Sequence, residues 1–175
     1  MCNDPVQLAR RAAQGDKEAF GDLVSLHQAA IFNVACRLLG DAAEAEDATQ
    51  ETFIRAYRSL KSFDPQRPLV PWLKRIAVNL CLDRLRRPAA LSLAEDVLAS
   101  NPGPESQTVQ REHSLQVQAA LLGLPPRFRA VIELRHFQEM SYEQIAETLK
   151  CPVNTVRTEL FRARKLLAMR LKDLK

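Results

Sequence analysis

The sequence predicts an all-α protein that consists of two small helical domains joined by a flexible linker. Hydrophobic residues recur at spacings of three and four along most of the chain, and no segment alternates as a half-buried strand would. Residues 90–108 break this pattern, because they contain Pro102, Gly103, Pro104 and several serines with little periodicity. We therefore expect one helical domain over residues 1–89 and a second over residues 109–175.

The charge distribution gives the first indication of function. The chain has a formal net charge of +4 and the hydrophobic fraction of a globular protein, 46%. Residues 52–88 hold 9 basic and 2 acidic side chains, and residues 125–175 hold 11 basic and 6 acidic ones. The segments that precede each of these blocks are net acidic. Two separate basic blocks suggest two contacts with nucleic acid.

In the first domain, the sequence predicts three helices, over residues 17–39, 42–60 and 72–87. Asp16 and Asp41 are suitable N-caps for the first two helices, and Gly40 ends the first. A proline-rich loop precedes the third helix. In the second domain, we expect helix from about Val109, a break at Pro125 and Pro126, and further helix over residues 128–137.

The end of the chain is the most informative segment. Ser141 is a suitable N-cap for a short helix, and a tight turn leads from it to a longer helix that begins near Pro152. The longer helix has one apolar seam, made of Val153, Val156, Leu160, Ala163, Leu167 and Leu171. Away from the seam lie Asn154, Arg157, Thr158, Phe161, Arg162, Arg164 and Lys165. A basic helix packed on a shorter one is the arrangement that enters a DNA major groove.

An ordinary helical hairpin with a solvated basic face would also fit these residues. We favour DNA binding because the turn, the seam and the basic face occur together. The helix over residues 72–87 carries a second cationic surface, made of Lys74, Arg75, Asn79, Arg84, Arg86 and Arg87. Trp72 stands at its start, where it either packs in the core, the better interpretation of a lone tryptophan, or stacks on the bases of a separated strand.

The helix over residues 42–60 has an acidic stripe of Glu44, Asp47 and Glu51. Like charges at these spacings cost a few tenths of a kcal/mol, so stability does not explain them. A solvated face and a docking surface for a basic partner are equally good interpretations. The opposite face, on which we also place Tyr57, is expected to be buried.

The sequence contains no pattern typical of an enzyme or of a metal site. The four cysteines show no CxxC pair and no ligand spacing with the three histidines, and there is no glycine-rich phosphate loop. We expect no metal, no cofactor and no catalytic residue. The absence of a long apolar run or a signal peptide favours a cytoplasmic protein without membrane contact.

Taken together, these segments resemble the extracytoplasmic-function (ECF) sigma factors of the bacterial sigma-70 family. The resemblance of the first domain to sigma region 2 is carried by AEDATQETFIRAYRSLKSF and PWLKRIAVNLCLDRLRR. The resemblance of the second domain to sigma region 4 is carried by LPPRFRAVIELRHFQEMSYEQIAETLKCPVNTVRTELFRARKLL. The resemblance covers nearly everything except the linker. It implies that the linker replaces the missing middle domain and runs near the RNA exit path.

The resemblance implies a role for each surface. The clamp of core RNA polymerase would bind Asp47, Gln50 and Glu51. Candidates both for packing and for contact with the polymerase flap are Leu124, Phe128, Val131 and Ile132. Recognition and melting of the −10 promoter element would use Ser62, Phe63, Asp64, Trp72, Lys74, Arg75, Asn79, Arg84, Arg86 and Arg87. Recognition of the −35 element would use Asn154, Thr155, Arg157, Thr158, Phe161, Arg162 and Lys165.

The chain departs from the family pattern at a few positions. Lys150 and Asn154 stand where the family often has glycine, and Glu159 replaces a frequent basic residue. Leu69 and Val70 replace the usual Phe-Arg pair. An anti-sigma factor that holds both domains in a closed arrangement is implied as a further partner. The alternative function is that of a free-standing helix-turn-helix regulator, which binds an operator as a dimer.

Overall fold

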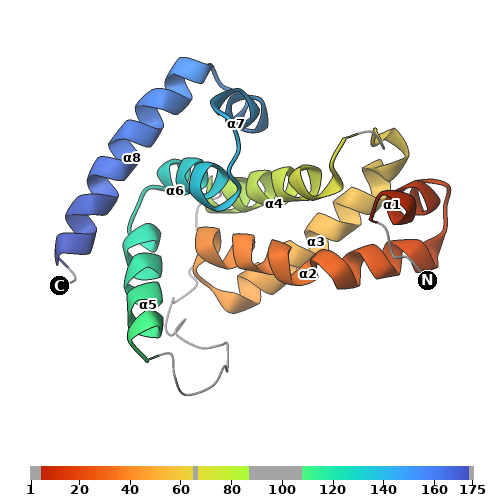
Figure 1. The fold of residues 1–175 in the computed structure, drawn as a ribbon, viewed down its shortest axis with the longest axis horizontal. Coiled ribbons are helices and arrows are strands. Elements are labelled where there is room, and N and C mark those ends of the chain that lie inside the picture. The colour runs from red at the N-terminus through yellow and green to blue at the C-terminus, as the bar shows by residue number, and fades with distance from the viewer. Residues whose placement is uncertain (1–4, 65–66, 87–107, 174–175) are drawn as a thin grey trace.

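The computed structural model describes residues 5–64, 67–86 and 108–173, and within these ranges it contains helices and no strand. The all-α prediction is therefore confirmed (Figure 1). The elements are α1 (Pro5–Ala13), α2 (Lys17–Leu39), α3 (Ala42–Ser59), η1 (Leu60–Ser62), α4 (Leu69–Arg86), α5 (Thr108–Leu122), α6 (Pro126–Ile132), η2 (Glu133–Phe137), α7 (Tyr142–Leu149) and α8 (Val153–Asp173).

The N-terminal helices begin and end where their capping residues predict. An oxygen of Asp16 accepts a hydrogen bond from the Ala19 N–H at 3.0 Å, and Asp41 accepts one from the Glu44 N–H at 2.7 Å. Gly40 ends α2 with a φ of 79°, a left-handed conformation that glycine adopts without steric cost. Helix α1 was not predicted; it buries Leu8 and two alanines against the rest of the domain.

Helix α4 begins at Leu69, three residues before the predicted start at Trp72. Pro71 does not prevent this, because the first N–H groups of a helix have no partner within the helix in any case. Its inward face holds Leu73, Ala77, Leu80 and Cys81, all buried. Burial raises the pKa of the Cys81 thiol to about 12, so the side chain behaves as a small apolar group.

The prediction that Tyr57 is buried is wrong. Its side chain is 42% exposed, and its ring meets the ring of Phe20 edge-on at 4.9 Å. Alanines and threonines, together with Phe53, already fill the buried face of α3. Tyr57 lies at the margin of that face and is therefore left at the surface beside Ile54, which is 46% exposed.

The C-terminal helices follow the predicted order, with a π-helical turn that was not predicted. The Gln138 N–H bonds to the Glu133 carbonyl over five residues at 3.1 Å, which widens the turn between α6 and α7. Helix α7 then begins with a capping box. The Gln144 N–H donates to the Ser141 hydroxyl at 3.2 Å, and the Ser141 N–H donates to the Gln144 side-chain oxygen at 2.9 Å.

The two groups of helices are in direct contact. Helix α6 packs on α2 and α4, α5 packs on α2, and α7 packs on α4 (Figure 1). The buried hydrophobic residues form one continuous cluster through both groups. Residues 87–107, which include most of the predicted linker and Arg87, lie outside the described residues. Among the residues that are described, no helix is both long and apolar enough to cross a membrane.

The turn between α7 and α8 gives a prediction about stability. Lys150 caps α7 with a φ of 51°, a left-handed conformation that favours glycine. We expect Lys150→Gly to raise the free energy of unfolding by about 0.5–1 kcal/mol, measured by urea denaturation. Lys165→Gly is the matched control: inside α8 the same replacement should cost about 1 kcal/mol. A destabilised Lys150→Gly variant would contradict this interpretation of the turn.

Candidate nucleic-acid interface

Helix α8 divides into a buried seam and an exposed basic face. Val156, Leu160 and Ala163 are buried, as their spacing predicts. The opposite face is exposed at Asn154, Arg157, Thr158, Phe161, Arg162, Arg164 and Lys165, whereas Thr155 is half-buried. Phe161 is 71% exposed, although it is among the largest apolar side chains of the chain. Most of the predicted face is therefore exposed to solvent, as a helix that enters a groove requires.

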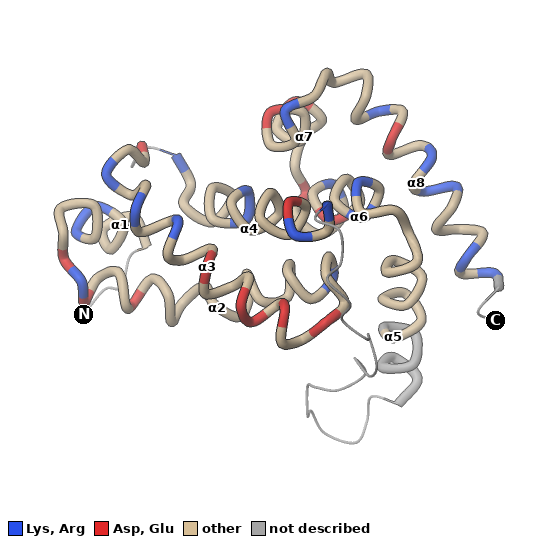
Figure 2. The backbone as a smooth tube through the Cα atoms, turned by 180° about the vertical axis from the view of Figure 1, so that it is seen from behind, with Lys and Arg blue, Asp and Glu red and all other residues tan. Residues whose placement is uncertain are grey.

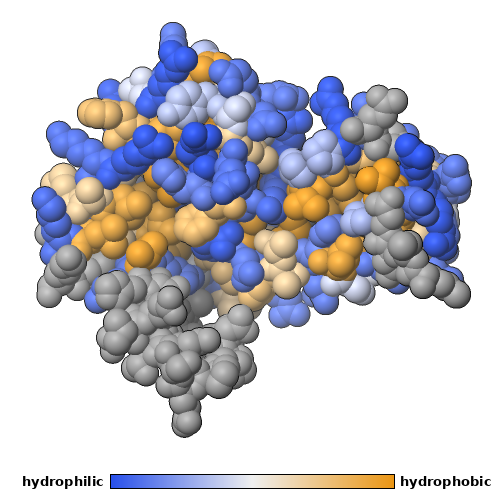
Figure 3. Space-filling view, viewed as in Figure 1, coloured by the Kyte–Doolittle hydropathy of each residue, from blue (hydrophilic) through white to orange (hydrophobic). Residues whose placement is uncertain are grey.

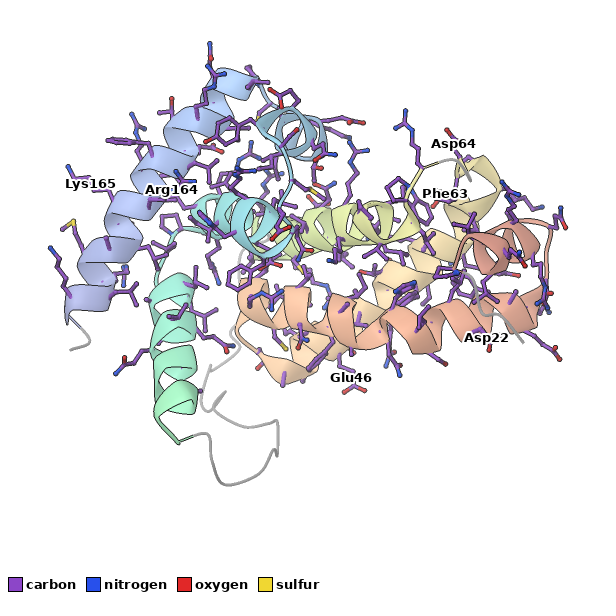
Figure 4. The ribbon with its side chains drawn as sticks, viewed as in Figure 1. Asp22, Glu46, Phe63, Asp64, Arg164 and Lys165 are labelled. Carbon is purple, nitrogen blue, oxygen red and sulfur yellow. The ribbon has the colours of Figure 1, made fainter. Side chains whose placement is uncertain are left out.

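Figure 2 shows basic residues along the length of α8 and acidic residues gathered at the start of α3. In Figure 3, hydrophilic side chains dominate the end of the molecule where α7 meets α8, and hydrophobic surface lies toward the middle. Figure 4 places Arg164 and Lys165 on α8 at one end of the molecule and Phe63 with Asp64 near the other. The loop before α4 and this part of α8 therefore lie well apart.

Arg127 on α6 fixes the position of α8 through an ion pair. Its Nε lies 3.1 Å from both carboxylate oxygens of Glu159, and its Nη1 donates to the Leu149 carbonyl at the end of α7. One guanidinium therefore joins α6, α7 and α8. Glu159 is therefore the acidic partner of Arg127 within this group of helices.

The cations of α4 lie in two different environments. Arg84 donates to the Glu44 carbonyl at 3.3 Å, and Arg86 lies 3.7 Å from Asp83. Arg75 instead points to the C-terminal helices, where its Nη2 lies 2.6 Å from the Glu147 carboxylate. Lys74 is also partly buried on this side, and burial lowers the pKa of its amine; the nearby Glu133 carboxylate opposes that shift.

The loop before α4 is organised by two aromatic rings. Phe63 is buried and packs on Trp72 with 4.7 Å between ring centroids. Trp72 is half-buried, which agrees with the core-packing alternative while leaving part of the ring accessible. Ser62 and Asp64 are exposed, and Asn79 is partly exposed. In this arrangement Phe63 supports the loop from inside, and the polar residues beside it face outward.

The acidic stripe of α3 is accessible. Asp47 and Gln50 are exposed, and Glu51 is partly exposed. Arg55 bonds to Glu51 at 2.8 Å and so lowers the pKa of that carboxyl, which remains ionised. Ile54 and Tyr57 extend the same face with exposed apolar area. No local pattern marks this pair as functional, although the helical spacing of Asp47, Gln50 and Ile54 is visible in the sequence.

Phe128 is partly buried at the contact of α6 with its neighbours, whereas Leu124, Val131 and Ile132 are fully buried. In this arrangement the three aliphatic residues pack in the core. Within the described ranges, no group of three or more His, Cys, Asp or Glu side chains is placed to hold a metal ion. The described residues therefore present cationic surfaces on α4 and α8 and an acidic surface on α3.

Comparison with known families and structures agrees with the geometry. The family model of Sigma-70 region 2 matches residues 23–90, and that of Sigma-70, region 4 matches residues 114–167. The ECF RNA polymerase sigma factor SigW of Bacillus subtilis is 37% identical, with 94% of this chain and 95% of SigW covered. RNA polymerase sigma-H factor of Pseudomonas aeruginosa is 38% identical over 96% of this chain and 94% of its own length.

Two solved structures resemble the fold. CnrH in complex with the cytosolic domain of CnrY has a TM-score of 0.69 and 31% identity, over 97% of this chain and 99% of CnrH. The sigma factor RpoE of Bartonella quintana, in complex with the anti-sigma factor NepR, also has a TM-score of 0.69. Its identity is 25%, over 87% of this chain and 96% of RpoE.

Proposed function

Because the chain belongs to the ECF sigma factors of the sigma-70 family and so directs transcription initiation, we propose a separate function for each of its surfaces. The division assigns residues 1–89 to polymerase docking and the −10 element, residues 109–175 to the −35 element, and residues 90–108 to the connection. This assignment is supported by one observation: the cationic surfaces lie on two different helices, α4 and α8, and an acidic surface lies on a third, α3.

The exposed face of α8 would read the −35 element in the major groove. Arg157 and Arg162 supply donors that fit the edges of guanine or the phosphates, and Asn154 can pair with adenine. Phe161 offers an apolar surface to a thymine methyl group, which accounts for its exposure. Thr155, Thr158 and Lys165 would position the helix on the backbone.

The loop before α4 and the polar face of α4 would hold the −10 element as a separated strand. Ser62, Asp64 and Asn79 are suited to hydrogen-bond flipped-out bases, and the accessible part of Trp72 to stack on one. Lys74, Arg75, Arg84, Arg86 and Arg87 would bind phosphates. Extruding a base costs a few kcal/mol, which stacking and pocket contacts offset.

The acidic face of α3 would dock on a basic surface of the polymerase clamp, with Asp47, Gln50 and Glu51 as the polar contacts. The exposed Ile54 and Tyr57 would add buried apolar area to that interface. Phe128 would meet the flap once α6 is separated from α2 and α4. The chain itself would catalyse no step, since binding energy alone orients the polymerase and stabilises strand separation.

We also propose that an anti-sigma factor binds this chain. We place the chain and these partners in the cytoplasm. Support comes from the similar RpoE, whose structure holds the anti-sigma factor NepR. The competing function, a free-standing operator-binding regulator, would need only the helix-turn-helix. It leaves the acidic face of α3 and the cations of α4 without a role.

Run-off transcription on genomic templates tests the proposal. Core RNA polymerase with this chain should produce promoter-specific transcripts that core polymerase alone does not. A chain that binds duplex DNA as a dimer, and adds no transcript to core polymerase, would support the operator-binding alternative instead.

The first residue-level prediction concerns −35 recognition. Arg157→Ala should weaken binding to the −35 duplex by about 1–3 kcal/mol and relax the preference at one base pair, because a guanidinium reads a base edge there. The measurement is a binding series over singly substituted duplexes. Lys172→Ala, at the far end of the same helix, is the control and should leave the preference unchanged. Unaltered preference at every position in Arg157→Ala would show that another face reads the DNA.

The second residue-level prediction concerns the binding of core polymerase. Asp47→Ala combined with Glu51→Ala should weaken the affinity for core polymerase by at least about tenfold, since the paired carboxylates face a basic partner. Affinity is measured by titration of labelled chain with core enzyme. The matched control, Glu18→Ala with Asp22→Ala, removes two exposed carboxylates at the same spacing from α2. Equal losses in both double variants would indicate a general charge effect and count against a specific site on α3.

A further inference from the structure

We propose that Arg127 is a positioning residue for DNA recognition: by binding the carboxylate of Glu159, it leaves Arg162 of α8 free to bind DNA. This inference rests on the proposed function, because it takes the exposed face of α8 as the surface that reads the −35 element. It adds to that surface a residue of α6 that acts through Glu159 and does not itself have to touch DNA.

An acidic side chain in the middle of α8 is unexpected for a helix that approaches phosphates. Among its 21 residues, α8 contains two acidic ones, Glu159 and Asp173, and Asp173 is its last residue. Glu159 follows Arg157 by two positions and precedes Arg162 by three. Phosphates repel a carboxylate, so an unpaired Glu159 would oppose the approach of its own helix to DNA.

The position of Glu159 on the helix places it beside the residues that are proposed to bind DNA. Thr155 precedes it by four residues and Arg162 follows it by three, so the three side chains share one stripe. Glu159 and Thr155 are partly exposed, and Arg162 is exposed. Glu159 therefore lies at the margin where the buried seam of α8 meets its exposed face.

A carboxylate at this margin has a choice of two cationic partners. Arg162 is within reach along the same helix, because residues three positions apart are neighbours on a helix surface. Glu159 instead pairs with Arg127, whose Nε lies 3.1 Å from both carboxylate oxygens. Arg162 forms no ion pair with any described residue. The Arg127 guanidinium thus keeps the acid from engaging an arginine of the DNA-binding face.

A second contact holds Arg127 in this place. Its Nη1 donates to the Leu149 carbonyl at 3.4 Å, at the C-terminal end of α7, where the helix dipole favours a cation. The side chains of Arg127 and Glu159 are 27% and 18% exposed, whereas those of the surface pair Arg55 and Glu51 are 45% and 35% exposed. Because solvent and salt screen the less exposed pair less, we expect it to persist while the outer face of α8 meets DNA.

The test titrates variants of the full-length chain with a fluorescent duplex of mixed sequence, about 24 base pairs long, in about 50 mM salt. This probe measures the sequence-independent part of DNA binding and so requires no known promoter. Arg127→Met removes the charge but keeps an unbranched apolar stem, and Glu159→Gln removes the acid. Lys172→Ala is the matched control, because it removes one exposed cation near the other end of α8. Thermal unfolding shows whether each variant is folded.

We expect Arg127→Met to lower the affinity about five- to tenfold, because the freed Glu159 pairs with Arg162 and repels phosphates. Glu159→Gln should bind at least as tightly as the wild type. Arg127→Met combined with Glu159→Gln should return the affinity to within about twofold of the wild type, since the acid is then absent. Lys172→Ala should lower it by less than about threefold. The loss in Arg127→Met should shrink in about 300 mM salt, which screens exposed charges.

The opposite pattern would overturn the proposal. If the ion pair only held α8 in place, Glu159→Gln would lose as much affinity as Arg127→Met, and the double variant would not recover. Unchanged binding by a folded Arg127→Met variant would also contradict it. If Arg127→Met does not fold, Glu159→Gln alone decides: full affinity supports the proposal, and reduced affinity rejects it.

Run-off transcription separates this proposal from the proposed function. A chain that shows the expected pattern on the duplex, yet adds no transcript to core polymerase, would reject the proposed function and leave the role of Arg127 in DNA binding supported. A chain that directs transcription, but whose Glu159→Gln variant loses affinity for the duplex, would reject the role of Arg127 alone.

Discussion

The buried carboxylate of Glu133 is the group on which the observed arrangement depends most. It is the one acidic side chain that is buried within the described part of the chain. An ionised carboxylate in such a place is stable only with partners, and Arg37 and Gln138 supply them. Because Arg37 belongs to α2 and Glu133 to the turn after α6, this requirement joins the two helical domains. The positions of α5, α6 and α7 against α2 and α4 agree with it.

The helices present three surfaces that differ in charge and in accessibility. The basic face of α8 and the acidic face of α3 are open to partners in this arrangement, whereas Arg75 of α4 is paired with Glu147 of α7.

The secondary structure could be predicted largely from local signals. Asp16, Asp41 and Ser141 cap helices as expected, because capping depends on neighbouring residues. The middle of the α8 seam is buried as its spacing predicts, whereas Val153, Leu167 and Leu171 are only partly buried. The contact of Arg37 with Glu133 joins residues 96 positions apart, and no local pattern marks it. The π-helical turn and the exposure of Tyr57 were missed for the same reason, since packing decides them. The roles of the individual site residues remain predictions.

The most direct test of the account is a comparison of the domain separation in two states of the same chain. Fluorescence energy transfer between dyes at positions 28 and 169, which are both exposed, reports the distance from α2 to α8. The account predicts high transfer in the free chain and a marked loss of transfer in the complex with core polymerase and promoter DNA. The same transfer efficiency in both states would contradict it, because Arg75 of α4 would then stay paired with Glu147 of α7 while transcription starts.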